Sequence, residues 1–158
     1  MSKSLKRVRA ALDAADVAFR IEEMSTETRT AAQAAEAAGC HLDQIAKSII
    51  VAGETSGRFA LFITAGGNQV DTARAAEILG EPTRVPKGDE VRKVTGFAIG
   101  GVSPVGHLTP ITAYMDPRLM EFAQVWGAAG TPRHIFEIAP GDLLKLTGAQ
   151  RAQFIQLG

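Results

Sequence analysis

The sequence predicts an α+β protein in which a curved, mixed, barrel-like β-sheet is surrounded by helices. Two observations favour this fold class. β-branched and aromatic runs of strand length recur along the chain, and they do not alternate strictly with helices long enough to be crossovers. In addition, the 158 residues contain no linker, repeat or low-complexity tract. We therefore expect a single domain over residues 1–158.

The chain is expected to begin with two helices that enclose a strand. Apolar residues recur at helical spacing between basic ones over about 3–15, which indicates an amphipathic helix. The segment "VAFRIEE" then alternates in the manner of a strand. Thr30, three residues before Gln33, forms a capping-box pattern, and the alanine-rich segment that follows predicts a helix that ends at Gly39.

The next segments predict a hairpin and a short helix. "IAKSIIVAG" and "GRFALFITAGG" are rich in β-branched and aromatic residues and are separated by the turn-rich "GETSG". In "DTARAAEILGEP", Asp71 or Thr72 can cap a helix, and Gly80 followed by Pro82 ends it.

The second half of the chain continues the mixed pattern. We expect helical segments at "GDEVRKVTG", for one turn at "PRLMEF", and from Pro140 to Gly148. We expect strands at "GFAIGG", "ITAYMD", "QVWGAAG" and "HIFEIA".

Composition and charge narrow the class of function. Hydrophobic residues make up 46% of the chain and charged residues 22%, and the 17 basic and 17 acidic residues cancel. This balance argues against a protein that holds nucleic acid mainly by neutralising phosphates. The basic residues near the N-terminus are either a solvated helix face or a local basic surface; they are Lys3, Lys6, Arg7 and Arg9.

The sequence predicts a cytoplasmic protein without a metal or a cofactor. Its apolar runs are too short to cross a bilayer, and the basic N-terminus lacks the continuous apolar run of a signal peptide. Cys40 is the only cysteine, so an internal disulfide is excluded. Three histidines lie too far apart for a metal site to be argued from spacing: His41, His107 and His134.

Lys47 is the first candidate for chemistry. It stands in "QIAKSIIVAG", at the entrance to an apolar strand. Either it extends its ammonium to solvent from a strand edge, or it is partly desolvated in a pocket and presents that ammonium to an anionic or carbonyl oxygen.

The second candidate is the segment "GFAIGGVSPVGH". Gly100 and Gly101 remove side chains where two backbone amides could approach a ligand, and Pro104 fixes φ in the same turn. The segment is either a tight connection or a backbone site for an oxyanion. A smaller glycine site, "WGAAGTPRH", would bring backbone close to a pocket wall before His134.

Together, "IAKSIIV", "VTGFAIGGVSPVGH", "AYMDPRL" and "VWGAAGTPRHIFEIAPGDLLKLTGA" resemble the YbaK/EbsC family of aminoacyl-tRNA deacylases, which is related to the editing (INS) domain of bacterial prolyl-tRNA synthetase. The resemblance covers about residues 17–147 and implies the YbaK-like fold. It also implies that the protein hydrolyses the ester between a wrong amino acid and the 3′-terminal adenosine of a tRNA. By resemblance the tRNA is the one for proline, and the amino acid is small, such as alanine, serine, threonine, cysteine or 2-aminobutyrate.

The resemblance also implies roles for particular residues. The essential lysine of the family falls on Lys47, and its GxxxP loop falls on Gly100 to Pro104, so Lys47 and Gly100 are the expected catalytic residues. The residues expected to bind the substrate are Gly101, Ser103, Pro104, Ala129, Gly130 and His134. Among these, Ala129 and Gly130, with Ala128, form the small-residue loop beside the amino-acid pocket, and His134 is the nearest candidate to limit the size of that pocket.

No metal or catalytic triad is needed for this chemistry, because an aminoacyl ester is already activated, and a positioned water with oxyanion stabilisation suffices. In the family, the 2′-hydroxyl of the terminal adenosine is thought to orient the water. The partner is the 3′ end of aminoacyl-tRNA, with prolyl-tRNA synthetase or an elongation factor as further candidates and no membrane.

Two alternatives remain open. The protein is a non-catalytic module that binds tRNA ends or amino acids beside a synthetase, or it is a small-molecule hydrolase that uses Ser103. The second is disfavoured because "GVSPVG" lacks the G-x-S-x-G pattern of a nucleophile elbow.

Overall fold

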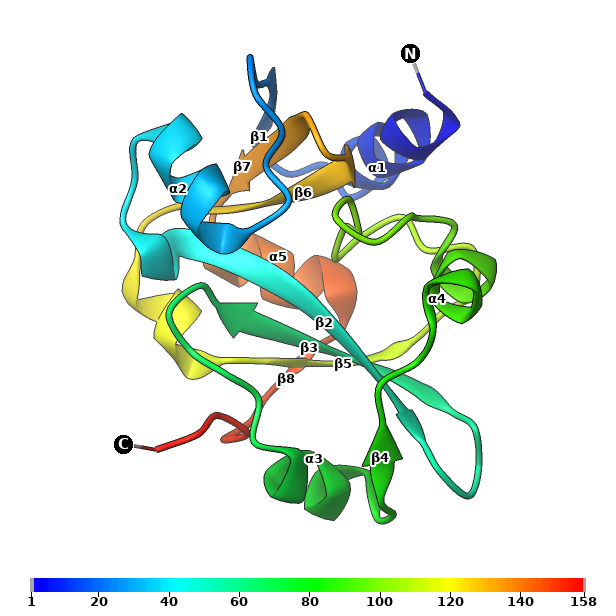
Figure 1. Ribbon diagram of the computed structural model, residues 1–158. Helices are drawn as coiled ribbons and strands as arrows, with labels where there is room; N and C mark the ends of the chain where they lie inside the picture. The colour runs from blue at the N-terminus through cyan, green and yellow to red at the C-terminus, as the bar shows by residue number, and fades with distance from the viewer. Residues whose placement is uncertain (1, 158) are drawn as a thin grey trace.

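The computed structural model describes residues 2–157, and Figure 1 shows its helices and strands. Several helices begin and end at residues that are suited to these positions. Thr30 caps its helix with the complete capping box, and Asp71 accepts hydrogen bonds from two backbone amides of the next helix. Four helices end at a glycine in the left-handed conformation. The α-helices are α1 (Lys3–Ala14), α2 (Ala31–Ala38), α3 (Thr72–Leu79), α4 (Gly88–Thr95) and α5 (Pro140–Thr147).

Eight strands form one mixed sheet with the order β1-β7-β6-β2-β3-β5-β8, and β4 pairs with β2 beside this path. The strands are β1 (Phe19–Glu23), β2 (Ile45–Gly53), β3 (Phe59–Ala65), β4 (Thr83–Arg84), β5 (Thr112–Met115), β6 (Val125–Thr131), β7 (His134–Ile138) and β8 (Gln150–Arg151). Two short 3₁₀ helices, η1 (Leu42–Gln44) and η2 (Pro117–Glu121), complete the chain. The α+β class and the mixed sheet predicted from the sequence are thus confirmed.

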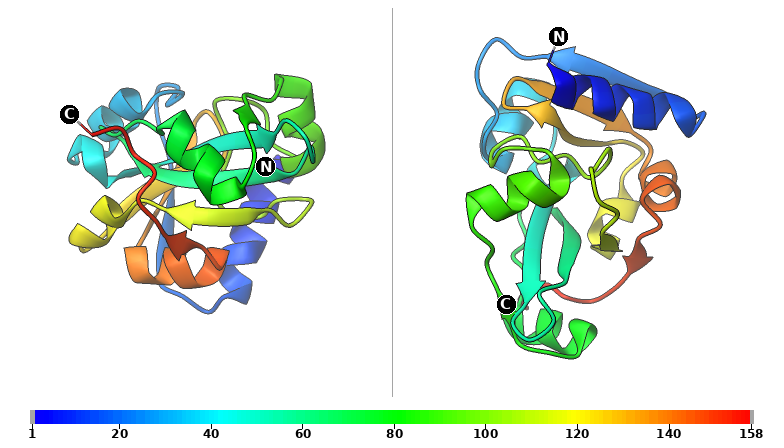
Figure 2. Two further views of the ribbon diagram at one scale, coloured as in Figure 1. Left: turned by 90° about the horizontal axis from the view of Figure 1, so that it is seen from below. Right: turned by 90° about the vertical axis from the view of Figure 1, so that its right-hand side faces the viewer.

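The pairings of β2 define the centre of the sheet. β2 and β3 form the predicted hairpin, whereas β6 runs parallel to β2 and β5 runs parallel to β3. At one end of the sheet, β6, β7 and β1 form an antiparallel set. The right-hand view of Figure 2 shows α1 against the end of the sheet that holds β6 and β7, with α3 at the opposite end.

The core lies between this sheet and α1. Leu5, Val8 and Leu12 on one face of α1 are buried in the main apolar cluster, which also contains Phe97 and Phe136. The helical spacing of these residues therefore predicted the buried face correctly.

One predicted strand is wrong. The segment 96–101 forms a turn instead of a strand, because Gly96 ends α4 with φ of +83° and the amide of Gly101 donates to the carbonyl of Ala98. The sequence alternates as in a strand, since Phe97 is fully buried and Ile99 is exposed, but a loop presents these side chains. The short strands β4 and β8 were not predicted.

Candidate active site

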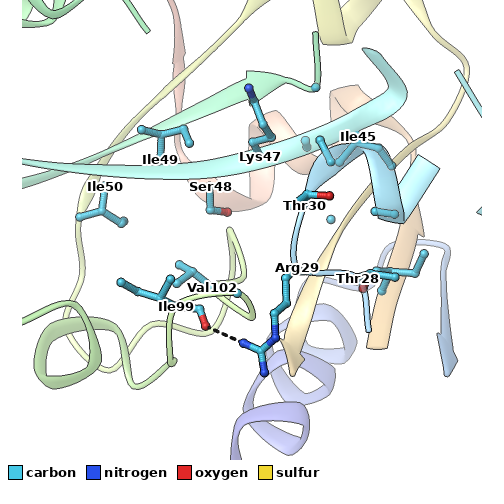
Figure 3. A pocket seen from close by; sticks show the side chains of 18 of the residues that line it. Thr28, Arg29, Thr30, Ile45, Lys47, Ser48, Ile49, Ile50, Ile99 and Val102 are labelled. Carbon is cyan, nitrogen blue, oxygen red and sulfur yellow. Dashed lines mark hydrogen bonds between the residues drawn. The ribbon is translucent and has the colours of Figure 1, made fainter. Parts of the chain in front are cut away.

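A cavity of about 590 Å³ lies beside β2 (Figure 3). Segments far apart in the sequence surround it: residues 28–31 and α2, the connection between β4 and α4, the loop after α4, and the start of β6. The cavity thus lies along β2, between the part that pairs with β6 and the part that pairs with β4.

The cavity exists because β2 lacks a strand partner along part of one edge. On the side away from β3, β2 pairs with β6 only at Ile45 and Ala46, and with β4 only at Ala52 and Gly53. Residues 47–51 are therefore unpaired on that side. This stretch of strand edge forms one wall of the cavity.

The phase of the hairpin shows which backbone groups face the cavity. In an antiparallel pair, alternate residues direct their N–H and C=O groups toward the partner strand. The amide of Gly53 donates to the carbonyl of Arg58 across the hairpin, and the pattern continues in steps of two along β2. The peptide groups of Ser48 and Ile50 consequently point away from β3, toward the cavity.

Lys47 is among the residues that line the cavity, but its side chain leaves β2 on the face opposite Ser48 and Ile50, and its ammonium points away from Arg29 and Ile99 (Figure 3). Its Nζ donates a hydrogen bond of 2.5 Å to the carbonyl of Asn68, in the turn after β3. Burial lowers the pKa of the Lys47 ammonium, while the negative charges of Asp116 and Asp43 oppose that shift. The lysine is therefore partly desolvated, its ammonium is bonded to a carbonyl of the protein itself, and its contact with a substrate stays a prediction.

The turn that holds Lys47 is itself fixed by Asp116, a residue whose role the sequence analysis did not identify. Asp116 is 1% exposed, and its Oδ2 accepts hydrogen bonds from Asn68 Nδ2 at 2.8 Å and from the amide of Ala65 at 3.1 Å. Its Oδ1 caps η2 by accepting from the amide of Arg118. The signal in the sequence was an aspartate directly before a proline at the start of a helical turn.

Gly100 borders the cavity on the side opposite Lys47. Its φ is +94°, a conformation that L side chains rarely adopt. A Cβ atom at this position would lie 2.7 Å from Nη1 of Arg29, which donates a 3.4 Å hydrogen bond to the carbonyl of Ile99. Arg29 therefore closes over the glycine turn at the cavity border (Figure 3).

The loop that carries Gly100 is fixed to α1 by Arg7. Arg7 donates hydrogen bonds to the carbonyls of Gly96 at 2.8 Å and Gly106 at 3.3 Å, and its guanidinium lies 4.9 Å from the centre of the Phe97 ring. Lys3, Lys6 and Arg9 are exposed, so the basic N-terminal helix face is solvated except at Arg7.

His107 closes the same loop. Its Nε2 lies 2.7 Å from the carbonyl of Ser103, and its ring packs edge-on against Phe97. Burial is the main reason why the pKa of His107 is lowered. A neutral imidazole that donates from Nε2 satisfies this geometry, which gives His107 a structural role.

Three of the predicted substrate-binding residues lie behind the cavity wall. Gly101 packs against the backbone of Thr131, since a Cβ on Gly101 would lie 3.1 Å from it. Ser103 is fully buried, and its hydroxyl accepts a hydrogen bond from the amide of Val105. Pro104 is buried beside Gly127.

The other three lie around the β6–β7 turn. Ala129 is fully buried in the core, and Gly130 packs against the backbone of Ser4 in α1. His134 has Nδ1 2.7 Å from the hydroxyl of Thr131 and borders a different hollow. Of the predicted site residues, the structure thus brings Lys47 and Gly100 to one cavity, and the substrate contacts of the other six remain predictions.

The ionisable side chains in the cavity lining are basic, although Arg29 is paired with Glu27 at 2.6 Å and the Lys47 ammonium points away from the glycine loop. Among the described residues that line it, the ionisable side chains are Lys47 and Arg29, and none is an acid, a histidine or a cysteine. Such a site attracts phosphate and carbonyl oxygens and stabilises a developing oxyanion, but its own side chains provide no general base.

Residues 2–157 contain neither a cluster of metal ligands nor a helix suited to span a membrane. No group of three or more histidine, cysteine, aspartate or glutamate side chains is placed to hold a metal ion. None of the described helices is both long and apolar enough to span a membrane.

Comparison with known proteins agrees with this geometry. The model of the aminoacyl-tRNA editing domain family matches residues 25–146. The chain is 33% identical over 140 residues to the uncharacterized protein YwhH of Bacillus subtilis (strain 168), covering 89% of this chain and 88% of that protein. It is 25% identical over 130 residues to EbsC of Enterococcus faecalis (strain ATCC 700802 / V583), whose proposed activity is Cys-tRNA(Pro)/Cys-tRNA(Cys) deacylation, covering 82% of this chain and 79% of EbsC.

A solved structure extends the likeness to three dimensions. The crystal structure of a proposed trans-editing enzyme for prolyl-tRNA synthetase superposes with a TM-score of 0.91 at 44% identity, covering 100% of this chain and 99% of that one. The family match spans most of the chain and includes the segments that line the cavity, among them those of Lys47 and Arg29. The chain therefore belongs to the aminoacyl-tRNA editing domain family, and its activity is the deacylation of aminoacyl-tRNA.

Proposed function

We propose that this deacylase acts in trans on tRNA for proline that carries a small, wrong amino acid. Two relatives described above support the choice of tRNA. The name of EbsC refers to Cys-tRNA(Pro), and the trans-editing enzyme is described as one for prolyl-tRNA synthetase. The observation that carries the proposal is that residues of the lysine strand and of the Gly100 turn both line one cavity. We expect alanine, serine, threonine, cysteine or 2-aminobutyrate as the amino acid.

Lys47 is proposed to bind an oxygen of the substrate. One of its three N–H groups is used by the carbonyl of Asn68, so two remain for a carbonyl or phosphate oxygen. An ammonium whose hydration is already reduced interacts more strongly with such an oxygen than one in water. The Asn68 bond also limits the motion of the lysine, which reduces the entropy lost when substrate binds.

The Gly100 turn is proposed to position the ester from the opposite side. Gly100 leaves room for the substrate where a side chain would meet Arg29, and its neighbouring peptide groups supply the polar contacts. Gly101, Ser103 and Pro104 would then act by holding the turn in this shape. Ala129, Gly130 and His134 would act similarly, by fixing the β6–β7 turn behind the small residues of the cavity wall.

The attacking water needs a base that the described cavity lining does not supply. As the family resemblance implies, the 2′-hydroxyl of the terminal adenosine would orient this water. The substrate would thus contribute part of the catalytic apparatus, and the protein would contribute binding, orientation and charge.

Selection among amino acids is proposed to depend on the size of the cavity end at α2 and β6. Ala34, Ile45, Trp126 and Ile135 line that end, and Gly127 also borders the cavity. A difference of one methylene in such an apolar pocket changes binding by about 1–3 kcal/mol. The relatives described above support prolyl-tRNA synthetase as the related enzyme and give no support to an elongation factor as partner.

A panel of aminoacyl-tRNAs tests the proposal. Purified protein is incubated with tRNA for proline charged with alanine, serine, threonine, cysteine, 2-aminobutyrate or proline, and ester loss is followed over time. We expect hydrolysis of one or more small esters and slow hydrolysis of the proline ester. Binding without turnover across the panel would instead favour a non-catalytic module.

Two variants assign the role of Lys47. Lys47→Ala is expected to lose most of the activity, and the exposed Lys145→Ala in α5 is the matched control that removes a distant lysine. If both variants deacylated at the wild-type rate, Lys47 would have no part in the reaction.

A further inference from the structure

Ser48 carries an unexplained polar atom. Among the residues that the structure describes, its Oγ is the one buried side-chain nitrogen or oxygen without a hydrogen-bond partner. Other buried hydroxyls in the chain are bonded: Thr64 donates to the carbonyl of Phe62, and Thr95 donates to that of Val91. A buried hydroxyl without a partner is unfavourable, so it calls for an explanation such as an absent ligand.

The direction of this hydroxyl points to the cavity. Side chains alternate along β2, and Figure 3 shows Ser48 and Ile50 on the side of the glycine loop, with Lys47 and Ile49 on the other side. The Ser48 side chain extends from β2 on the side of Ile99 and Val102, and its covered Oγ would meet a ligand in the cavity after a rotation of the side chain. The unpaired peptide group of Ser48 lies on the same free strand edge.

Ser48 also lies between two apolar ends of the cavity. One end is formed by Ile45 with α2, and the other by Ile50 and Ile99 (Figure 3). Val85 lies toward the second end, because the preceding Arg84 pairs with Ala52, two residues beyond Ile50 in β2. Val85 is 83% exposed and Ile99 is 61% exposed, so the second end opens to solvent with apolar side chains at its rim. The cavity thus has large apolar side chains at both ends, with Thr30 beside Ile45, and the Ser48 side chain lies between them.

An aminoacyl-adenosine has the same order of chemical groups. A small amino-acid side chain lies at one end, the ester and ribose hydroxyls lie in the middle, and a flat base with apolar faces lies at the other end. The base must lie toward the open end, because the rest of the tRNA continues from that nucleoside into solvent.

We propose that the Ser48 hydroxyl hydrogen bonds the ribose–ester centre of the aminoacyl-adenosine, with the adenine packed at the Val85–Ile99 rim and the amino-acid side chain at the Ile45 end. The inference rests on the proposed function, because it takes the 3′-terminal nucleoside of a charged tRNA as the ligand. It adds a substrate-binding residue, and an orientation for the substrate, to the roles of Lys47 and Gly100.

The first test separates a binding role from a structural one. Ser48→Ala should leave the melting temperature unchanged or raise it, because it removes an unpaired buried hydroxyl. The same change should lower kcat/KM for the preferred aminoacyl-tRNA about 10-fold, the value of one hydrogen bond. Ser48→Thr keeps a hydroxyl and should retain more activity than Ser48→Ala.

Thr147→Val is the matched control. The hydroxyl of Thr147 donates to the carbonyl of Leu143 in α5, and it lies outside the cavity lining. This variant should lower the melting temperature and leave kcat/KM unchanged. If Ser48→Ala behaved like Thr147→Val, Ser48 would be a structural residue and the inference would be overturned.

The second test measures binding without turnover. The probe is a 3′-aminoacylamino-3′-deoxyadenosine, whose amide resists hydrolysis, and its dissociation constant is measured by calorimetry. Ser48→Ala should weaken binding about 10-fold. Ile99→Ala should weaken binding of this probe but not of an analogue that lacks the base. An unchanged dissociation constant in Ser48→Ala, or an Ile99→Ala effect that does not depend on the base, would overturn the inference.

The binding test does not depend on which tRNA is the substrate. If the wild-type protein hydrolysed no ester of tRNA for proline, the proposed substrate would fail, whereas the binding of the amide probe would still test Ser48.

Discussion

Gly100→Ala gives the sharpest test of the glycine turn, because the structure separates its two costs. The backbone cost comes from φ of +94°, which for a residue with a Cβ is about 1–2 kcal/mol. The steric cost is smaller, because the new methyl would meet Nη1 of Arg29 at 2.7 Å, and this is the end of a flexible, half-exposed side chain. In a domain of 158 residues, the backbone cost alone corresponds to a fall in melting temperature of roughly 2–8 °C.

The effect on activity should be larger than the effect on stability. When Arg29 moves, its hydrogen bond to the carbonyl of Ile99 is lost, and the methyl group occupies the border of the cavity. A displacement of about 1 Å in a catalytic contact can lower a rate by roughly 10²-fold. We therefore expect kcat/KM for the preferred aminoacyl-tRNA to fall at least about 10-fold.

Gly148→Ala is the control for the backbone term. Gly148 ends α5 with φ of +66°, and a Cβ there would meet nothing within 4 Å. This variant should lose stability without losing activity in the same deacylation assay. The reasoning would be refuted if the two variants, matched for melting temperature, deacylated the substrate at equal rates.

Three further predictions use the charges and hydrogen bonds around the site. Burial lowers the pKa of Lys47, so the ammonium, and with it the deacylation rate, should be lost as pH rises through that pKa. Lys47→Arg should therefore extend activity to higher pH. Wild-type and variant pH–rate profiles that fall at the same alkaline pH would contradict this. Burial makes the pKa of His107 lower in the folded protein than in the unfolded protein, so the unfolded state binds a proton more readily. The free energy of unfolding should therefore fall as pH decreases from above 6.5 toward the pKa of the folded state. His107→Gln should flatten this loss in melting curves at pH 8 and pH 5, and equal slopes for both proteins would refute it. Asp116→Ala should cost about 2–4 kcal/mol in urea unfolding, because the buried donors of Ala65 and Asn68 lose their acceptor; a variant as stable as the wild type would show that water replaces the carboxylate.

Local signals predicted most of the fold because they act over a few residues. The capping box at Thr30 and the cap at Asp71 lie where the sequence placed them, since each is formed by side chain and backbone within one helical turn. The expected strand at 96–101 was wrong because alternation alone does not distinguish a strand from a loop whose glycine adopts φ of +94°. The two-residue strands β4 and β8 carry too little pattern to be predicted.

The site was predictable only where its residues form motifs. Lys47 and Gly100 stand in recognisable strings, and both border the cavity. Arg29 and Val85 join them through tertiary structure alone, since no spacing in the sequence relates residue 29 to residue 100. Ser48 looked like an ordinary strand residue, because the lack of a hydrogen-bond partner appears only when its surroundings are known.

The incomplete pairing of β2 explains why this site is built largely from backbone. β6 leaves the edge of β2 after Ala46, and β4 reaches it only at Ala52, so the strand edge between them faces a cavity instead of another strand. A wall of peptide groups can bind an ester and a ribose without charged side chains, and side chains elsewhere then serve to shape the space. Gly127 illustrates this, because it borders the cavity and a Cβ there would lie 3.1 Å from the buried Phe136 ring behind the wall, which would have to shift slightly. Substitutions that add a methyl to the wall should therefore damage deacylation more than removal of most surface charges.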